Sequence, residues 1–271
     1  MTIDTILQTV VKELQVCSFI RGIVLGGSRA TGNATETSDL DIGIYYDGMD
    51  DQQLNTIASR LDDTHRESLI CREGEWGNWV NCGGWLVIGG IHVDLILRDY
   101  KRVIDILRTS DNGNFSSHYQ PGHPHAFLDI MYRGELASCR ILSSDKEFLR
   151  IKQKAEQYPD ALKHSLIRFF SFEAEFSCML AEKCLKNEDL YYLSGHLFRS
   201  VSALNQILFA FNEQWCLNEK KAVFRIDTFP LAPAFYSSKV NGIFRLVSAS
   251  PALAVQELRQ LYTDVTALCE N

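Results

Sequence analysis

The sequence predicts an α/β (α+β) fold, with a small mixed β-sheet in its N-terminal part and an α-helical bundle in its C-terminal part. Three observations predict this fold. Short β-branched apolar runs punctuated by glycine are confined to residues 19–98, and small polar or acidic motifs stand at the ends of these runs. Long segments with apolar residues at helical spacing follow. We expect the helices of the N-terminal part to cover one face of its sheet.

The N-terminal part alternates between the two kinds of pattern. The strands that we expect are FIRGIVL (residues 19–25), DLDIGIYY (39–46), the middle of the Trp- and Gly-rich segment 75–90, and IHVDLILRD (91–99). Apolar residues at helical spacing predict helices at residues 3–14, 50–63 and 100–107.

The pattern changes at a polar segment, DNGNFSSHYQPGHPH, which begins at Asp111. We place the domain boundary here, with a first domain at residues 1–112 and an α-helical domain at 113–271. In the second domain a polar connection, LNEKKAVFRIDTFP, separates the later helices. The helices expected there span residues 126–138, 146–157, 160–186, 190–213 and 252–269.

Composition restricts the classes of partner. The formal net charge is -7, which does not favour bulk attraction to nucleic acid or to an anionic membrane surface. The eight cysteines include no C-x-x-C pair, so we expect free thiols in a reducing compartment rather than disulfides. The N-terminus lacks the features of a signal peptide, and no stretch is apolar enough to span a bilayer. We therefore expect a cytoplasmic protein.

Three features of the N-terminal part together indicate chemistry. A strand ends at Gly26-Gly27-Ser28, a second strand carries Asp39 and Asp41 two residues apart, and a later strand carries Asp94. Carboxylates two apart on a strand share a face, where they repel each other unless a cation lies between them. Mg²⁺ prefers such oxygen ligands, and a glycine turn lets phosphate oxygens approach the backbone closely. These parts suit phosphoryl or nucleotidyl transfer with two metal ions.

The segment LGGSRATGNATETSDLDIGIYY resembles the signature of the DNA polymerase β-type nucleotidyltransferase superfamily, and Asp94 in IHVDLIL matches its third carboxylate. The resemblance covers residues 20–98. With a helical C-terminal part, the chain is similar to the aminoglycoside-type (antibiotic) nucleotidyltransferases. The resemblance implies that Gly26, Gly27 and Ser28 hold a triphosphate. It also implies that Asp39, Asp41 and Asp94 are the catalytic residues and the ligands of two Mg²⁺ ions.

Other residues have both a functional and a structural interpretation. Arg29 follows the glycine turn and is a candidate phosphate ligand or a surface arginine. Lys220 could reach the triphosphate from the helical part, although exposed lysines are common. Trp76, Trp79 and Trp85 could stack on a nucleobase or a sugar, but aromatic residues of a small sheet more often belong to the core.

Three histidines in the polar segment, His118, His123 and His125, could form a zinc site. No cysteine accompanies them, and their spacing is more typical of a loop. Glu173 and Glu175 are both candidates for an acceptor-side base, and the sequence does not distinguish between them.

The function that we expect is transfer of a nucleoside monophosphate, AMP from ATP or from another NTP, to a hydroxyl group of a small-molecule acceptor. The C-terminal part would provide the acceptor contacts. Two alternatives remain open, namely nucleotidylation of a protein side chain, as in antitoxin-like members of the superfamily, and a nucleotide-binding regulatory protein without turnover. A tRNA-directed polymerase is disfavoured by the net charge.

Overall fold

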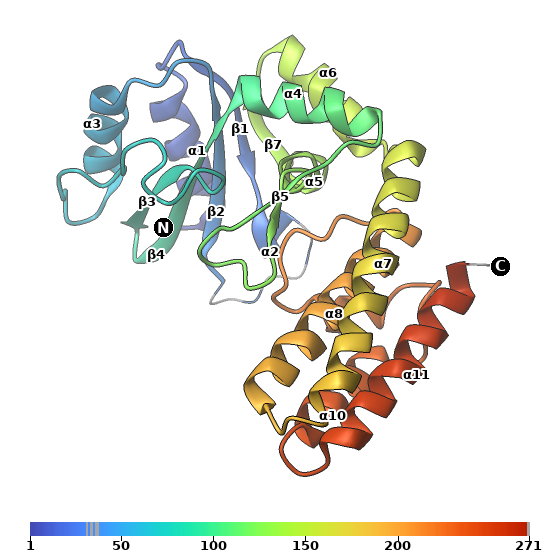
Figure 1. Cartoon of the computed structure of the whole chain (residues 1–271). Coiled ribbons are helices and arrows are strands. Elements are labelled where there is room, and N and C mark those ends of the chain that lie inside the picture. Colours follow the sequence, from blue (N-terminus) through green and yellow to red (C-terminus); the bar gives the residue numbers. More distant parts are fainter. Residues whose placement is uncertain (31, 33–34, 36–37, 270–271) are drawn as a thin grey trace. The chain divides into compact units, whose positions relative to one another are not determined.

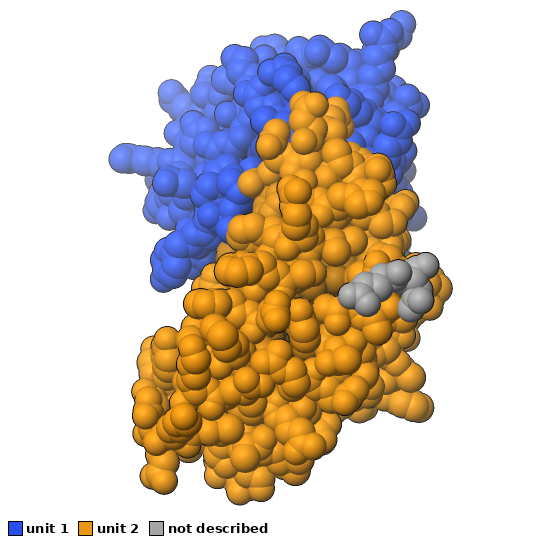
Figure 2. Space-filling model, turned by 45° about the vertical axis from the view of Figure 1, so that its right-hand side comes forward, with its two compact units in different colours: residues 1–109, 116–122, 128–157 blue, residues 110–115, 123–127, 158–271 orange. Residues whose placement is uncertain are grey.

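The computed structural model describes residues 1–269 except 31, 33–34 and 36–37. The chain forms two compact units, which Figure 2 colours separately. Unit 1 comprises Met1–Thr109, Ser116–Gly122 and Leu128–Gln157, and unit 2 comprises Ser110–Phe115, His123–Phe127 and Tyr158–Asn271. Unit 1 therefore continues along the chain beyond residue 112, where the sequence predicts a domain boundary. The domains 1–112 and 113–271 stay a prediction.

Unit 1 is built on a five-stranded mixed sheet with the strand order β3-β4-β2-β1-β7 (Figure 1). Its strands are β1 (Ile20–Leu25), β2 (Leu40–Tyr46), β3 (Cys82–Ile88), β4 (Ile91–Asp99) and β7 (Arg140–Ser144). β2 and β4 are parallel, and the other neighbouring strands are antiparallel. A small mixed sheet followed by helices is the fold class predicted from the sequence, and that prediction is confirmed.

One face of the sheet is covered by α1 (Ile3–Leu14) and α3 (Asp51–Leu61). Both are amphipathic helices of the predicted kind, and they bury apolar side chains such as Ile6 and Leu54. These side chains pack on every second residue of β2, beginning with Leu40. Because strand residues alternate between faces, this packing directs the intervening residues of β2 to the other face.

The opposite face of the sheet is partly covered too, by a helix that lies beyond the predicted N-terminal part. Phe148 of α6 (Lys146–Glu156) is fully buried, and its ring meets the Tyr45 ring edge-on at a centroid distance of 5.0 Å. It also fills the space above Gly22, where a Cβ would lie 2.5 Å from the Phe148 ring. The remaining longer helices of unit 1 are α4 (Tyr100–Asp111), which ends in unit 2, and α5 (Met131–Ser138).

β7 is a strand that the sequence does not predict. It pairs antiparallel with β1 and forms an edge of the sheet. Its five residues, RILSS, are half-buried or exposed and contain only two apolar side chains, so the alternating pattern is too short to recognise. The helix expected at residues 126–138 begins only at Met131, after the two-residue strand β6 (Phe127–Leu128), which pairs with β5 (Ser117–His118).

Unit 2 is helical. Its long helices agree with the predicted ones: α7 (Asp160–Cys184), α8 (Leu190–Phe211) and α11 (Pro251–Cys269). Two shorter helices were not predicted, α9 (Ala222–Ile226), which lies within the expected polar connection, and α10 (Tyr236–Leu246). α7 and α8 pack along each other, and the buried hydroxyl of Ser200 donates a hydrogen bond to the Ala174 carbonyl across them.

No helix in the described part of the chain is long and apolar enough to cross a membrane. All eight cysteines are described, and all are free thiols, as the sequence predicts. Burial raises the pKa of Cys82 to about 12 and that of Cys139 to about 11. Thiols with such pKa values are almost entirely protonated near neutral pH, so neither is a reactive cysteine.

Candidate active site

Asp41 and Asp94 are direct register partners on the parallel strands β2 and β4. Register partners on neighbouring strands lie about 4.8 Å apart and point to the same face of a sheet. The buried alternate residues of the two strands, such as Leu40 and Val93, belong to the core under α1 and α3. Both carboxylates therefore stand on the opposite face of the sheet. Their role as metal ligands, together with Asp39, stays a prediction.

The glycine turn lies directly against Asp41. β1 ends at Leu25, and the Gly26 backbone N–H donates a hydrogen bond to the Asp41 carbonyl at 2.8 Å. Gly27 then begins the four-residue helix α2 (Gly27–Ala30) with a φ of +58°. A Cβ on Gly27 would lie 1.8 Å from Asp41 Oδ2. Glycine is thus required at this position for two reasons, namely its backbone conformation and its close approach to the carboxylate.

Asp39 lies just before β2 rather than within it, which differs from the predicted strand start. Its backbone is held by Arg29, whose Nε donates hydrogen bonds to the carbonyls of Ser38 at 3.0 Å and of Asp39 at 3.2 Å. Arg29 therefore links the helix after the glycine turn to the segment that presents Asp39. This arrangement assigns Arg29 a positioning contact within the protein.

The electrostatics of Asp94 show that the carboxylates lie within range of one another. Burial raises the pKa of Asp94, the negative charge of Asp39 raises it further, and His92 partly offsets both effects. A carboxylate that is half-buried beside another carboxylate is unfavourable for the protein alone. The negative charges of Asp39 and Asp94 therefore repel each other.

The sequence of this unit matches a known family. Residues 3–115 match the family model described as a nucleotidyltransferase domain. This segment is a nucleotidyltransferase domain. The match spans α1 to the end of α4 and includes every strand that carries a predicted site residue.

No curated protein matches the chain by sequence. Among solved structures, a nucleotidyltransferase-like protein from Exiguobacterium sibiricum 255-15 is similar at 10% identity and a TM-score of 0.46, over 99% of this chain and 75% of that chain. The spectinomycin adenyltransferase AAD(9) from Enterococcus faecialis, solved with ATP and spectinomycin, is similar at 12% identity and a TM-score of 0.37. That similarity covers 97% of this chain and 98% of that chain.

The remaining predicted ligands of the triphosphate lie in different parts of the chain. Ser28 is half-buried in α2 of the nucleotidyltransferase domain, directly after Gly27. Lys220 is exposed in unit 2, and its backbone N–H donates a hydrogen bond to the Asn218 side chain. Its contact with a triphosphate stays a prediction.

The three histidines considered for zinc belong to different units. His118 belongs to unit 1, where its ring stacks on the Trp79 ring with the ring centroids 3.9 Å apart. His123 and His125 belong to unit 2 and contact Glu219 and Glu173. Throughout the described residues, the structure has no group of three or more His, Cys, Asp or Glu side chains that could by itself hold a metal ion.

Glu173 takes part in an ion-pair network inside unit 2. His125 Nε2 donates to its carboxylate at 3.1 Å, and Arg199 Nε lies 2.7 Å away. Burial alone would raise the pKa of Glu173, but the hydrogen bond from His125 and the charge of Arg199 together hold it below its ordinary value. The exposed Glu175, two residues further on, lacks this environment.

Trp85 lies on the surface rather than in the core. It lies in β3 as the register partner of Asp94, on the carboxylate face of the nucleotidyltransferase domain. Its side chain is 62% exposed, so the expectation that it belongs to the core is wrong. The alternation of β3 contains the signal, because the next residue, Leu86, is buried and Trp85 must point the other way.

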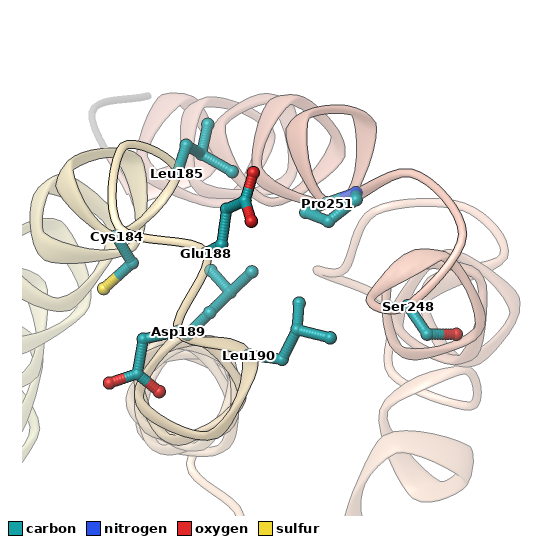
Figure 3. A pocket seen from close by; sticks show the side chains of 8 residues that line it. Cys184, Leu185, Glu188, Asp189, Leu190, Ser248 and Pro251 are labelled. Atoms are coloured by element: carbon teal, nitrogen blue, oxygen red, sulfur yellow. The ribbon is translucent and has the colours of Figure 1, made fainter.

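Unit 2 also contains a pocket of about 320 Å³ near the turn from α7 to α8 (Figure 3). Its lining is apolar apart from two acidic residues and one serine, and it contains none of the predicted site residues. The lining residues are Cys184, Leu185, Glu188, Asp189, Leu190, Leu193, Ser248 and Pro251.

Proposed function

We propose that the protein transfers a nucleoside monophosphate, AMP from ATP, to a hydroxyl group of a small-molecule acceptor and releases pyrophosphate. The observation that carries this proposal is the placement of Gly27, Asp41 and Asp94. A positive-φ glycine turn lies against one carboxylate, and a second carboxylate is its register partner on the same face of a nucleotidyltransferase domain. Turn and carboxylates together can hold a triphosphate and its cations.

The carboxylates fit Mg²⁺ as the cofactor. Asp39, Asp41 and Asp94 offer only hard oxygen donors, and the repulsion between Asp39 and Asp94 is what a bound cation would relieve. Mg²⁺ commonly takes one or two carboxylates and completes its shell with waters and phosphate oxygens. Asp39, Asp41 and Asp94 would therefore hold the two ions. When bound, these ions neutralise charge on the triphosphate and around the reacting phosphorus.

Residues of the chain bind the triphosphate, position Asp39 and act on the acceptor hydroxyl. The backbone of Gly26 and Gly27 and the hydroxyl of Ser28 hold the triphosphate. Arg29 keeps the segment with Asp39 in place beside this turn. Asp94 orients the acceptor hydroxyl and receives its proton. Lys220 is a further candidate ligand of the triphosphate.

The experiment is an assay of pyrophosphate release with ATP and Mg²⁺ over a panel of hydroxyl-bearing acceptors, beginning with aminoglycosides. Mass spectrometry would identify the product as an acceptor carrying AMP. Asp41→Asn and Asp94→Asn should each abolish nearly all release, whereas Asp4→Asn, an exposed carboxylate on α1, should not. Label from ATP that appears on polypeptide instead would favour protein modification. Mg-ATP binding without release on any acceptor would favour a regulatory protein.

A further inference from the structure

Four residues form a row across the sheet of unit 1, three of them on the adjacent strands β3, β4 and β2 and the fourth directly after β1. Trp85 is the register partner of Asp94, Asp94 is the register partner of Asp41, and Gly26 bonds to the Asp41 carbonyl. Three strand spacings separate the ends of this row, which amounts to about 14 Å. The side chains of Trp85, Asp94 and Asp41 share one face, with the glycine turn at one end and an indole ring at the other.

If the proposed function is correct, the two ends of the row bind different reactants. In nucleotidyl transfer the attacking and leaving oxygens lie roughly in line on opposite sides of the reacting phosphorus. The leaving pyrophosphate belongs with the glycine turn, at the Gly26 end. The attacking hydroxyl must then approach from the other side, over Asp94, so Trp85 stands at the acceptor end.

The indole ring of Trp85 is held in place by a second tryptophan. It stacks on Trp76 with ring centroids 4.6 Å apart and an interplanar angle of 25°. Trp76 in turn lies over Gly83, where a Cβ would be 2.4 Å from its ring. Both polar groups of the Trp76 backbone form hydrogen bonds. Its N–H donates to the Asn81 carbonyl at 3.0 Å, and its carbonyl accepts from Gln120 Nε2 at 2.6 Å.

Trp85 nevertheless remains 62% exposed, which is unusual for a side chain so firmly supported. A hollow of about 640 Å³ adjoins the pair beyond the edge strand β3. Most of its lining comes from α3 and from residues 66–75, and Trp76, Gly83 and Trp85 complete it. Volumes of this size accommodate small organic molecules. The hollow provides room for parts of an acceptor that extend past the indole.

We propose that Trp85, backed by Trp76, is the platform on which a ring of the acceptor stacks, so that the acceptor is a ring-bearing alcohol rather than a linear one. An indole face attracts planar rings and the apolar faces of sugars without requiring a hydrogen bond. The ring would place its hydroxyl over the neighbouring Asp94. This inference rests on the proposed function for the identity of the ligand as an acceptor.

The first test does not depend on turnover. The full chain is labelled with 5-fluorotryptophan, which gives one ¹⁹F resonance for each of its four tryptophans. The Trp85 resonance is assigned by its loss in Trp85→Phe. Spectinomycin and phenyl β-glucoside serve as ring probes and sorbitol as the linear control. The Trp85 resonance should move with a ring probe and stay in place with sorbitol and with Mg-ATP alone. A shift with Mg-ATP alone, or none with either ring probe, would overturn the proposal.

The second test uses the best acceptor from the pyrophosphate assay. Trp85→Ala should raise the KM for that acceptor on the order of 10-fold while kcat and the KM for ATP change little. Trp85→Phe should retain most of the acceptor affinity. Tyr119→Ala, which removes a 95% exposed aromatic side chain from the same unit, is the control and should leave KM unchanged.

The two hypotheses fail in different ways. Pyrophosphate release with an unchanged acceptor KM in Trp85→Ala would overturn the platform and leave the proposed function standing. A ring-dependent shift of the Trp85 resonance without release on any acceptor would support a ring-binding platform and count against the proposed function.

Discussion

Gly27 approaches Asp41 so closely that a methyl group on its Cα would lie 1.8 Å from Asp41 Oδ2. The Cγ of Asp41 would also lie only 2.7 Å from this methyl group, and the φ of +58° is one that side-chain-bearing residues rarely adopt. The geometry of the turn and the position of the carboxylate are therefore linked. A side chain added at Gly27 must therefore displace the Asp41 carboxylate.

Gly27→Ala should abolish nearly all nucleotidyl transfer and lower the free energy of unfolding. The added Cβ meets the Asp41 carboxylate and also strains the positive-φ backbone, which alone costs about 1–2 kcal/mol. Gly90→Ala is the matched control, because Gly90 has a φ of +77° with no atom near its Cβ position. Urea unfolding and initial rates measure both variants. Equal stability losses in the two variants, with activity retained in Gly27→Ala, would contradict the close contact.

Arg29→Lys should lower kcat almost as much as Arg29→Ala. The guanidinium reaches two neighbouring carbonyls, those of Ser38 and Asp39, and an ammonium group cannot reproduce this forked geometry. Affinity for Mg-ATP, measured by calorimetry, should change little. If Arg29 instead acts on phosphate through its charge, Arg29→Lys would keep most of its activity and Arg29→Ala would lose affinity for ATP.

Phe148→Ala should destabilise unit 1 by about 3–5 kcal/mol, because it removes a fully buried ring from the second face of the sheet. The neighbouring Leu149 on the same helix is 43% exposed, and Leu149→Ala should cost much less. Urea unfolding monitored by circular dichroism measures both. A loss in Phe148→Ala no larger than in Leu149→Ala would mean that α6 does not belong to the core of this unit.

Acid should weaken unit 2 through Glu173 and Glu219, whose pKa values lie below their ordinary value of 4.5. Burial opposes both shifts. It is outweighed at Glu173 by the hydrogen bond from His125, and at Glu219 by the contact with His123 and the hydrogen bond from the His125 backbone N–H. A depressed carboxyl pKa stabilises the fold fully above pH 4.5. The stabilisation is lost as the pH falls from there through the folded pKa.

Chemical unfolding between pH 7 and pH 3 measures this loss. Glu173→Gln should make the free energy of unfolding fall less steeply below pH 4.5. Glu257→Gln, an exposed carboxylate on α11, is the control and should leave the slope unchanged. Identical slopes for Glu173→Gln and the wild type would show that the network around Glu173 does not stabilise the fold.

The sequence was sufficient to predict the face of the sheet on which Asp41 and Asp94 lie. Residues of a strand alternate between the two faces, and the apolar residues on either side of each carboxylate occupy the core face. It also located the glycine turn, since paired glycines at the end of an apolar strand favour a turn. What it could not supply was the register between β2 and β4. Register depends on contacts between distant segments, and it is what makes these two residues neighbours.

The features that the sequence did not predict have different physical causes. β7 is a short edge strand whose pairing with β1, rather than its own composition, makes it a strand. Trp85 was assigned to the core because aromatic residues usually are buried, yet its exposure follows from Leu86 occupying the core side of the same strand. Arg29 finds its partners in the carbonyls of Ser38 and Asp39, and no sequence pattern encodes bonds to backbone atoms.

The measurement that tests the central claim most directly is the thermal stabilisation of the full chain by Mg²⁺ and ATP together, for the wild type, Asp41→Asn and Asp4→Asn. A ligand at 100 times its Kd stabilises the folded state by about 2.7 kcal/mol, which appears as a higher Tm. The wild type and Asp4→Asn should show this increase with Mg-ATP and much less of it with ATP and a chelator. Asp41→Asn should lose most of it. An undiminished Mg-ATP shift in Asp41→Asn would contradict the claim that the carboxylate face of the nucleotidyltransferase domain binds the metal and the nucleotide.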